Sequence, residues 1–302
     1  MRQRQINVTK DIYLDTNLWN ALCDQSVDPT ALVRRLALKN AYLAPGIHIF
    51  YELAKTFRNS DNKSRERGKV LFSYFKEFLL ADTHCVKDNL ELLAREMWAA
   101  KLGSPVFDIT LSMEDRNLIF QEAEKFSKGE ISRLGSEFLQ QQSDFASNTR
   151  SNQLKQLTLR ADMTRYLKSI PPAQLEQWLH GEGTSKAGIK MLAVHILRRF
   201  PDVPEVQTLE YATALLAPSP KRFARGVVRS DLYYNWRCAN RGSVPKDLID
   251  DMYHVLNAVY CDVYATAERG QTEYAHMILT PLTKVAVYTG GTPLDDWIES
   301  LC

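Results

Sequence analysis

Four acidic residues occur at positions from which their carboxylates could share one site. Asp15 directly follows the apolar run IYL, and Glu268 follows the run DVYAT by one residue. Glu52 lies in the second turn of a helix predicted after AYLAP, and Asp251 lies at the start of DLIDDMYHVLNAVY. Carboxylates gathered closely cannot all stay ionised unless a cation offsets their charge. Oxygen ligands favour Mg²⁺ or Mn²⁺, and such an ion can activate water for in-line attack on a phosphodiester.

Each acid also has a simpler interpretation when it is taken alone. Asp15, followed by Thr16 and Asn17, could only cap the helix predicted at 17–24. Negative charge in the first turn of a helix is favourable, which would account for Asp250 together with Asp251.

Helical periodicity separates these acids further. Asp251 borders the apolar stripe of its helix, whereas Asp250 lies opposite that stripe and is predicted to face outward. Glu52 falls away from the packing stripe of its own helix, which predicts a solvated position. His48 and His254 are interpreted as polar residues on packed helices and not as a zinc pair. Asp262 could simply start its strand.

The elements that must position these acids alternate between strands and helices at both ends of the chain. The predicted strands are 11–15, 41–45, 262–266 and 284–290, with 83–87 as a further candidate, and helices are predicted between them. This alternation predicts an α/β fold with a parallel, doubly wound sheet, in which ligands bind at the carboxyl ends of the strands.

Residues 103–246 differ, because helical periodicity there is interrupted by SIPP, GEGTSKAG, FPDVP and APSP and strand signals are nearly absent. We therefore predict one discontinuous α/β domain formed by 1–102 and 247–302. The region 103–246 is predicted to be a mostly helical insertion that takes part in substrate recognition.

The two ends of the chain resemble the PIN-domain nucleases. The residues that carry the resemblance are IYLDTN, Glu52 in IHIFYELAKTF, and DDMYHVLNAVYCDVYATAE. They cover about 60 residues at the front and about 55 at the end. No single motif is specific, and the order and spacing carry the likeness. The resemblance implies a PIN-like parallel sheet flanked by helices, with three or four acids around one or two divalent ions, and cleavage of RNA or, in some branches, DNA.

Residue by residue, the resemblance matches Asp15, Glu52 and Asp251 to the first three acids of the family. His254 falls where larger relatives often have histidine. Glu268 falls at the last acid, which is usually Asp, so the longer side chain leaves open whether a second metal position exists. The predicted supporting residues are Thr16, Asn17, Asp250, Asp262 and Thr266.

A basic segment at 220–246 could provide a track for a polyanion. Four aromatic residues are interleaved with its basic residues, and this combination suits contact with a nucleic-acid backbone and stacking on bases. The alternative is a solvated helix face with aromatic residues in the core. The predicted nucleic-acid-binding residues are Lys221, Arg222, Arg225, Arg229, Arg237 and Arg241.

Composition sets broader limits. The net charge of the 302-residue chain is +2, so no overall basic field indicates nucleic-acid binding. Five scattered cysteines without a CxxC pair suggest reduced thiols, and the start of the chain is polar, without an apolar signal core. No run of about 20 apolar residues occurs. We expect a cytoplasmic protein that does not enter a membrane.

The leading hypothesis from the sequence is a metal-dependent endoribonuclease that uses Mg²⁺ or Mn²⁺. One alternative is a DNA nuclease of the same chemistry that acts on single strands or flaps. The other is a degenerate PIN-like module that binds nucleic acid or a protein without cutting. RNA and DNA are not distinguished at this stage, because recognition of the 2′-hydroxyl depends on pocket geometry. A regulatory partner and the oligomeric state also stay open.

Overall fold

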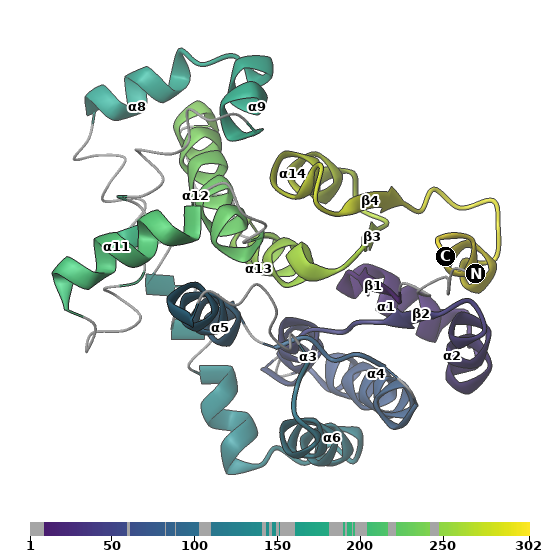
Figure 1. Ribbon diagram of the computed structural model, residues 1–302. Helices are drawn as coiled ribbons and strands as arrows, with labels where there is room; N and C mark the ends of the chain where they lie inside the picture. Colours follow the sequence, from purple (N-terminus) through teal and green to yellow (C-terminus); the bar gives the residue numbers. More distant parts are fainter. Residues whose placement is uncertain are drawn as a thin grey trace, which may run out of the picture.

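A four-stranded parallel sheet forms the centre of the α/β fold in the computed structural model (Figure 1). Its order is β2-β1-β3-β4, and every neighbouring pair is parallel. The strands are β1 (Lys10–Leu14), β2 (Ala41–Leu43), β3 (Val263–Thr266) and β4 (Lys284–Val287). The structure describes residues 9–58, 61–81, 83–87, 89–102, 110–140, 143–144, 147–148, 151, 161–180, 190, 192–194, 196, 204–216, 222–241 and 248–302.

The strands confirm the predicted alternation, with one difference. The segment 83–87 forms no strand of this sheet, and Val86 makes only isolated bridges to Gly46 and to Thr110. The order places β2 on one side of β1 and β3 on the other. The direction in which strands are added to the sheet therefore reverses between β1 and β3. A crevice at the carboxyl ends of these two strands is the position where such sheets bind ligands.

Helices from both ends of the chain surround the sheet. Apolar side chains hold these helices together. For example, Trp19 near the start of the chain packs edge to face against Phe75 and Phe78 of a later helix. These helices are α1 (Thr16–Asp24), α2 (Pro29–Ala37), α3 (Ile47–Ala54), α4 (Asn62–Leu80), α5 (Asn89–Leu102), α13 (Leu248–Asn257), α14 (Arg269–Leu279) and α15 (Leu294–Ser300). The short 3₁₀ helices η1 (Lys55–Arg58) and η2 (Ala258–Tyr260) follow α3 and α13.

The described part of 103–246 consists mainly of helices. Within that described part, the one β-type pairing is an isolated bridge between Thr110 and Val86. The helices are α6 (Met113–Ser127), α8 (Ala161–Lys168), α9 (Pro172–His180), α11 (Glu205–Leu216) and α12 (Arg222–Arg241). α12 packs closely against the sheet-containing part, because a Cβ added at Gly226 would lie 2.8 Å from Val259. One cluster of buried apolar residues therefore includes residues from the sheet, its helices and α12.

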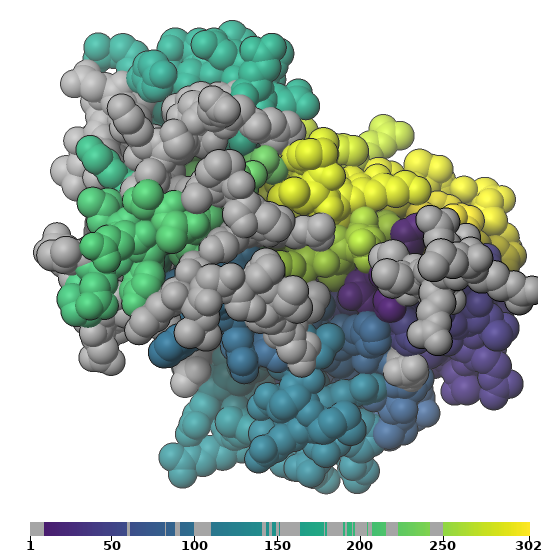
Figure 2. Space-filling model, viewed as in Figure 1, coloured from purple at the N-terminus to yellow at the C-terminus, as the bar shows by residue number. Residues whose placement is uncertain are grey.

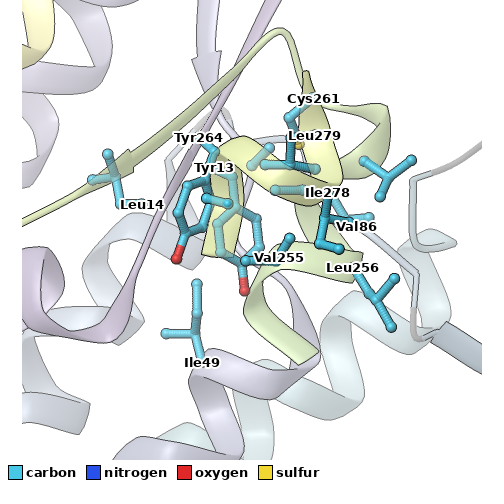
Figure 3. Close-up of a cluster of buried hydrophobic side chains, with 14 of the residues drawn as sticks. Tyr13, Leu14, Ile49, Val86, Val255, Leu256, Cys261, Tyr264, Ile278 and Leu279 are labelled. Carbon is cyan, nitrogen blue, oxygen red and sulfur yellow. The ribbon is translucent and has the colours of Figure 1, made fainter. Parts of the chain in front are cut away.

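Two stacked tyrosines lie at the centre of the core. The rings of Tyr13 on β1 and Tyr264 on β3 are 5.9 Å apart between centroids. Figure 3 shows them side by side, with both hydroxyl oxygens at the same end of the pair. The hydroxyl of Tyr13 lies 2.9 Å from Nδ1 of His254 on α13, and the hydroxyl of Tyr264 donates to Oε1 of Gln271 on α14.

The first and last described segments lie next to each other on one side of the molecule (Figure 2). Lys10 Nζ donates to the backbone carbonyl oxygen of Leu301 at 2.8 Å, which ties β1 to the end of the chain. None of the described helices is long and apolar enough to cross a membrane.

Candidate functional site

Asp15 is fully buried at the carboxyl end of β1. Its Oδ1 accepts a hydrogen bond from the backbone N–H of Leu18 at 2.9 Å, so the predicted cap of α1 is present. Its Oδ2 accepts from the hydroxyl of Thr266 at the end of β3. A cap alone needs no burial, and Asp28 caps α2 in the same way while exposed to solvent. The burial of Asp15 therefore indicates a role beyond helix capping.

Glu268 lies next to Asp15 because β1 and β3 are neighbours in the sheet. The Thr266 hydroxyl that donates to Asp15 also accepts from the backbone N–H of Glu268 at 3.0 Å. Asn17 Nδ2 donates to Glu268 Oε2 at 3.0 Å. The turn after β3 is thus connected to the start of α1, and two of the predicted supporting residues, Asn17 and Thr266, contact the predicted acids.

Asp251 approaches the same edge of the sheet from α13. Its Oδ1 accepts from Nε2 of Gln271, which is buried in the first turn of α14, at 2.8 Å. Gln271 Oε1 in turn accepts from the hydroxyl of Tyr264 at 2.6 Å. Sequence analysis did not identify Gln271, and its only signal is its place three residues after Glu268.

Glu52 does not occupy a solvated helix face, so this expectation was wrong. Its side chain is only 19% exposed, and its Oε2 lies 2.7 Å from Nε2 of His254 on α13. The same Nε2 is 3.0 Å from the hydroxyl of Thr16, and Nδ1 of His254 is 2.9 Å from the hydroxyl of Tyr13. His254 therefore connects β1, the start of α1, and α3.

Asp250 differs from its predicted outward position, and Asp262 does not take the supporting role that was predicted for it. Asp250 does not face outward, because its side chain is 19% exposed and its Oδ2 forms an ion pair with Lys55 Nζ at 2.5 Å. Asp262 precedes β3 and accepts from the backbone N–H of Asp11 at 2.8 Å. It therefore lies at the amino end of the strand, away from the other acids, and has the strand-starting role of its simpler interpretation.

Burial and like charge make this group of acids electrostatically unfavourable without a cation. Burial raises the pKa of Asp15 to about 6, and the charge of Glu268 adds to this against the opposing effects of Thr266, Leu18 and His254. Burial also raises the pKa of Asp251 to about 6, with Glu268 and Glu52 adding to the shift. Perturbed carboxyls of this kind are typical of functional sites.

The contact between Glu52 and His254 favours the ionised form of the acid, in contrast to the surroundings of Asp15 and Asp251. Burial alone would raise the pKa of Glu52, but His254, His48 and Lys55 together hold it well below its usual value. Burial would lower the pKa of His254, but Glu52, Asp15 and Asp251 raise it above its usual value. The three neighbouring acids therefore favour the protonated form of His254.

Asp15→Asn is expected to be more stable than the wild-type protein in EDTA, by a margin that grows with pH. Folding raises the pKa of Asp15 from 3.8 to about 6, so the folded protein binds this proton more tightly than the unfolded chain does. The resulting stabilisation is present below pH 4 and is lost as the pH rises to about 6. The shift corresponds to about 3 kcal/mol.

Denaturant unfolding of both proteins between pH 4 and 8 measures this difference directly. A constant difference across that interval would contradict the prediction. Addition of Mn²⁺ at pH 7.5 should raise the midpoint of the wild-type protein more than that of Asp15→Asn, because a ligand that binds only the folded state stabilises it.

The prediction that Arg229 and the interleaved aromatic residues contact nucleic acid was wrong. Arg229 is buried, and its guanidinium donates to the backbone carbonyls of Leu179, Ile278 and Thr280 at 2.9–3.0 Å. It is a structural residue. The four interleaved aromatic residues are buried in the core and are not available for stacking on bases; they are Phe223, Tyr233, Tyr234 and Trp236.

The other basic residues of this segment have different surroundings. Arg241 is exposed at the end of α12, and Arg225 is partly buried. Arg237 Nη1 donates to the hydroxyl of Tyr233 at 3.2 Å. Lys221 lies outside the described residues, as does the side chain of Arg222. Among the described basic side chains of α12, Arg241 is therefore the exposed one, and Arg225 and Arg237 are partly accessible.

Comparison of the chain with protein-family models, curated proteins and solved structures gave no match. The proposal that follows therefore depends on the chemistry of the site and on the motifs in the chain.

Proposed function

We propose that the protein is a PIN-like, metal-dependent nuclease that hydrolyses phosphodiester bonds of RNA. One observation carries the proposal. Acids from separate segments meet at the carboxyl ends of β1 and β3, where Asp15 and Asp251 have pKa values raised by burial and by the charge of Glu268. A parallel sheet binds its ligands at this position. The order of the acids along the chain supports the PIN-like assignment.

The donor set has the chemistry that a hard divalent cation prefers, and an ion would have to draw its carboxylates closer together, because among the described residues only His48, Glu52 and His254 have ligand atoms all within 4.8 Å of one another. Asp15, Asp251 and Glu268 supply only oxygen ligands, which suit Mg²⁺ or Mn²⁺. Each oxygen of Asp15 accepts one hydrogen bond and retains a second lone pair. A cation among these carboxylates would relieve the repulsion that raises their pKa values. Glu52 borders this set, and its Oε2 is engaged by His254.

The side chains around the carboxylates would orient them toward a bound ion. Thr266 and the N–H of Leu18 orient Asp15, and Gln271 orients Asp251. In its protonated form, His254 would stabilise the ionised forms of Asp15, Glu52 and Asp251 around it. When bound, Mg²⁺ or Mn²⁺ supplies Lewis-acid chemistry: it lowers the pKa of water and offsets developing charge at phosphorus.

The proposed contact with the nucleic-acid backbone lies on the second half of α12. Arg237 reaches the hydroxyl of Tyr233, which donates to Glu273 of α14 at 3.3 Å. This side of α12 therefore faces the helix that begins just after Glu268. Arg241 lies one turn further along, at the end of α12 that precedes α13 and its acids. The proposed contacts are to phosphate, which gives no preference for sequence.

The five cysteines are free thiols, of which Cys85, Cys238 and Cys261 are buried. Free thiols are typical of a reducing compartment, and they support the proposal of a cytoplasmic location.

Purified protein incubated with labelled single-stranded RNA and DNA should cut RNA in Mg²⁺ or Mn²⁺ and cut nothing in EDTA. The reason is that the acids lose the ion that the reaction requires. Products resolved on a denaturing gel distinguish internal cuts from trimming at an end. Cleavage of DNA alone would support the DNA nuclease. Folded protein that binds RNA but cuts neither substrate with either ion would support the degenerate module and contradict the proposal.

A further inference from the structure

Two helices present matching pairs of one histidine and one acid to each other. His48 and Glu52 are four residues apart on α3, and Asp250 and His254 are four residues apart on α13. Residues at this spacing share one face of a helix. Among the described residues, one group of three potential metal ligands has ligand atoms all within 4.8 Å of one another, and it consists of His48, Glu52 and His254.

His48 has a buried ring nitrogen that no hydrogen bond from the described residues engages. Its side chain is 5% exposed, and its Nε2 is buried without a hydrogen-bond partner in the described structure. The nearest acid oxygen, Asp250 Oδ1, is 3.8 Å away, which is beyond hydrogen-bond distance. Burial disfavours a positive charge on His48, and a neutral imidazole offers one nitrogen lone pair to a metal ion. A buried polar atom without a partner is costly, and a ligand would satisfy it.

The spacing of the ligand atoms suits a small tetrahedral ion. Two ligands bound to Zn²⁺ at 2.0–2.1 Å in tetrahedral geometry are about 3.4 Å apart. The distance from His254 Nε2 to Glu52 Oε2 is 2.7 Å, and every ligand pair is within 4.8 Å. One ligand pair is closer than the required separation and no pair is more than about 1.4 Å beyond it, so small side-chain movements would bring the three ligands to one ion.

The surroundings of the three ligands resemble the outer shell of a metal site. The hydroxyl of Tyr13 lies 2.9 Å from Nδ1 of His254, and such a partner orients a ligating imidazole. Lys55 Nζ contacts Glu52 Oε1 at 3.5 Å and Asp250 Oδ2 at 2.5 Å. The lysine therefore occupies one oxygen of each acid and leaves Glu52 Oε2 and Asp250 Oδ1 on the side of the histidines.

We propose that His48, Glu52 and His254 form a binding site for a divalent transition-metal ion of the Zn²⁺ type, with Asp250 beside the open fourth position. Two imidazoles and one carboxylate favour such an ion over Mg²⁺, which prefers oxygen ligands. Binding would replace the proton that His254 shares with Glu52, so one proton leaves Nε2 as the ion arrives. This site differs from the oxygen site at Asp15 and does not depend on nuclease activity, although both lie near Glu52.

Equilibrium dialysis of EDTA-stripped protein against Zn²⁺, followed by elemental analysis, tests the site. We expect one tightly bound Zn²⁺ per chain that millimolar Mg²⁺ does not displace. His48→Gln should weaken this binding by more than about 100-fold, because loss of an outer-shell partner alone typically costs 10–100-fold. His48 Nε2 makes no hydrogen bond, so His48→Gln should fold like the wild-type protein, as circular dichroism can verify.

Three matched proteins complete the test. His276→Gln alters an exposed histidine and should bind Zn²⁺ like the wild-type protein. Tyr13→Phe should lose about 10–100-fold in affinity through the outer shell. Cys302→Ser removes the exposed thiol and should bind Zn²⁺ like the wild-type protein. The wild-type protein loaded with Co²⁺ should lack a sulfur-to-metal charge-transfer band, because no thiol is among the proposed ligands. Absence of tight Zn²⁺ binding, or equal binding by folded His48→Gln, would overturn the proposal. Its failure leaves the Mg²⁺ cleavage assay unaffected, so the two proposals are tested separately.

Discussion

Asp15→Asn should reduce metal-dependent cleavage of RNA by at least about 10²–10³, the usual effect of removing one important electrostatic contact from a catalytic site. Asp15 is the most buried of the four acids and lies between the charges of Glu268 and His254. Asparagine keeps its shape and can still cap α1, but it removes the charge that would anchor the ion. The measurement is the initial rate of cleavage in Mg²⁺ and in Mn²⁺, with the fold checked by circular dichroism.

Asp28→Asn is the matched control for this substitution. Asp28 Oδ1 accepts from the N–H of Ala31 at 3.0 Å, just as Asp15 Oδ1 accepts from Leu18 at 2.9 Å. Both changes keep a good cap, but Asp28 is exposed at the start of α2, whereas Asp15 is fully buried. The control should cut at the wild-type rate. An Asp15→Asn protein that also cuts at that rate would remove Asp15 from the proposed site.

Arg229→Met should destabilise the protein by about 3–5 kcal/mol, because a buried charged donor is removed from acceptors that stay buried. Its guanidinium donates to three backbone carbonyls and ties α12 to Leu179 of α9 and to the end of α14. Burial lowers the pKa of Arg229 to about 10, with Arg225 adding to the shift, so the side chain is still charged at neutral pH. The midpoint of urea unfolding measures the loss.

Arg241→Met provides the comparison, because Arg241 is exposed at the end of the same helix. Its stability should stay within about 0.5 kcal/mol of the wild-type value, as is usual for surface substitutions. Its affinity for RNA should fall and depend less steeply on salt, because one phosphate contact is lost. If Arg229→Met instead kept full stability and lost RNA binding, the segment would act as the track that the sequence suggested.

The sheet and the meeting of Asp15 with Glu268 could be predicted from the sequence alone. Short apolar runs separated by helical segments specify parallel strands, because a parallel sheet buries both faces of its strands. The carboxyl ends of such strands lie at one edge, so an acid that follows each strand must lie near the other. The capping role of Asp15 was also visible, because the residue types that cap helices act locally.

Only the tertiary structure decided how the helices use their polar residues. A stripe of apolar residues predicts the buried face of a helix only if the opposite face is solvated. α3 is buried on nearly every side, including His48, so Glu52 has no solvated face to occupy and pairs with His254. The stretch 226–230 of α12 is buried, and this packing converts Arg229 from a surface cation into a donor to backbone carbonyls. Partners more than 200 residues apart in sequence, such as Glu52 and His254, meet through packing that no local pattern encodes.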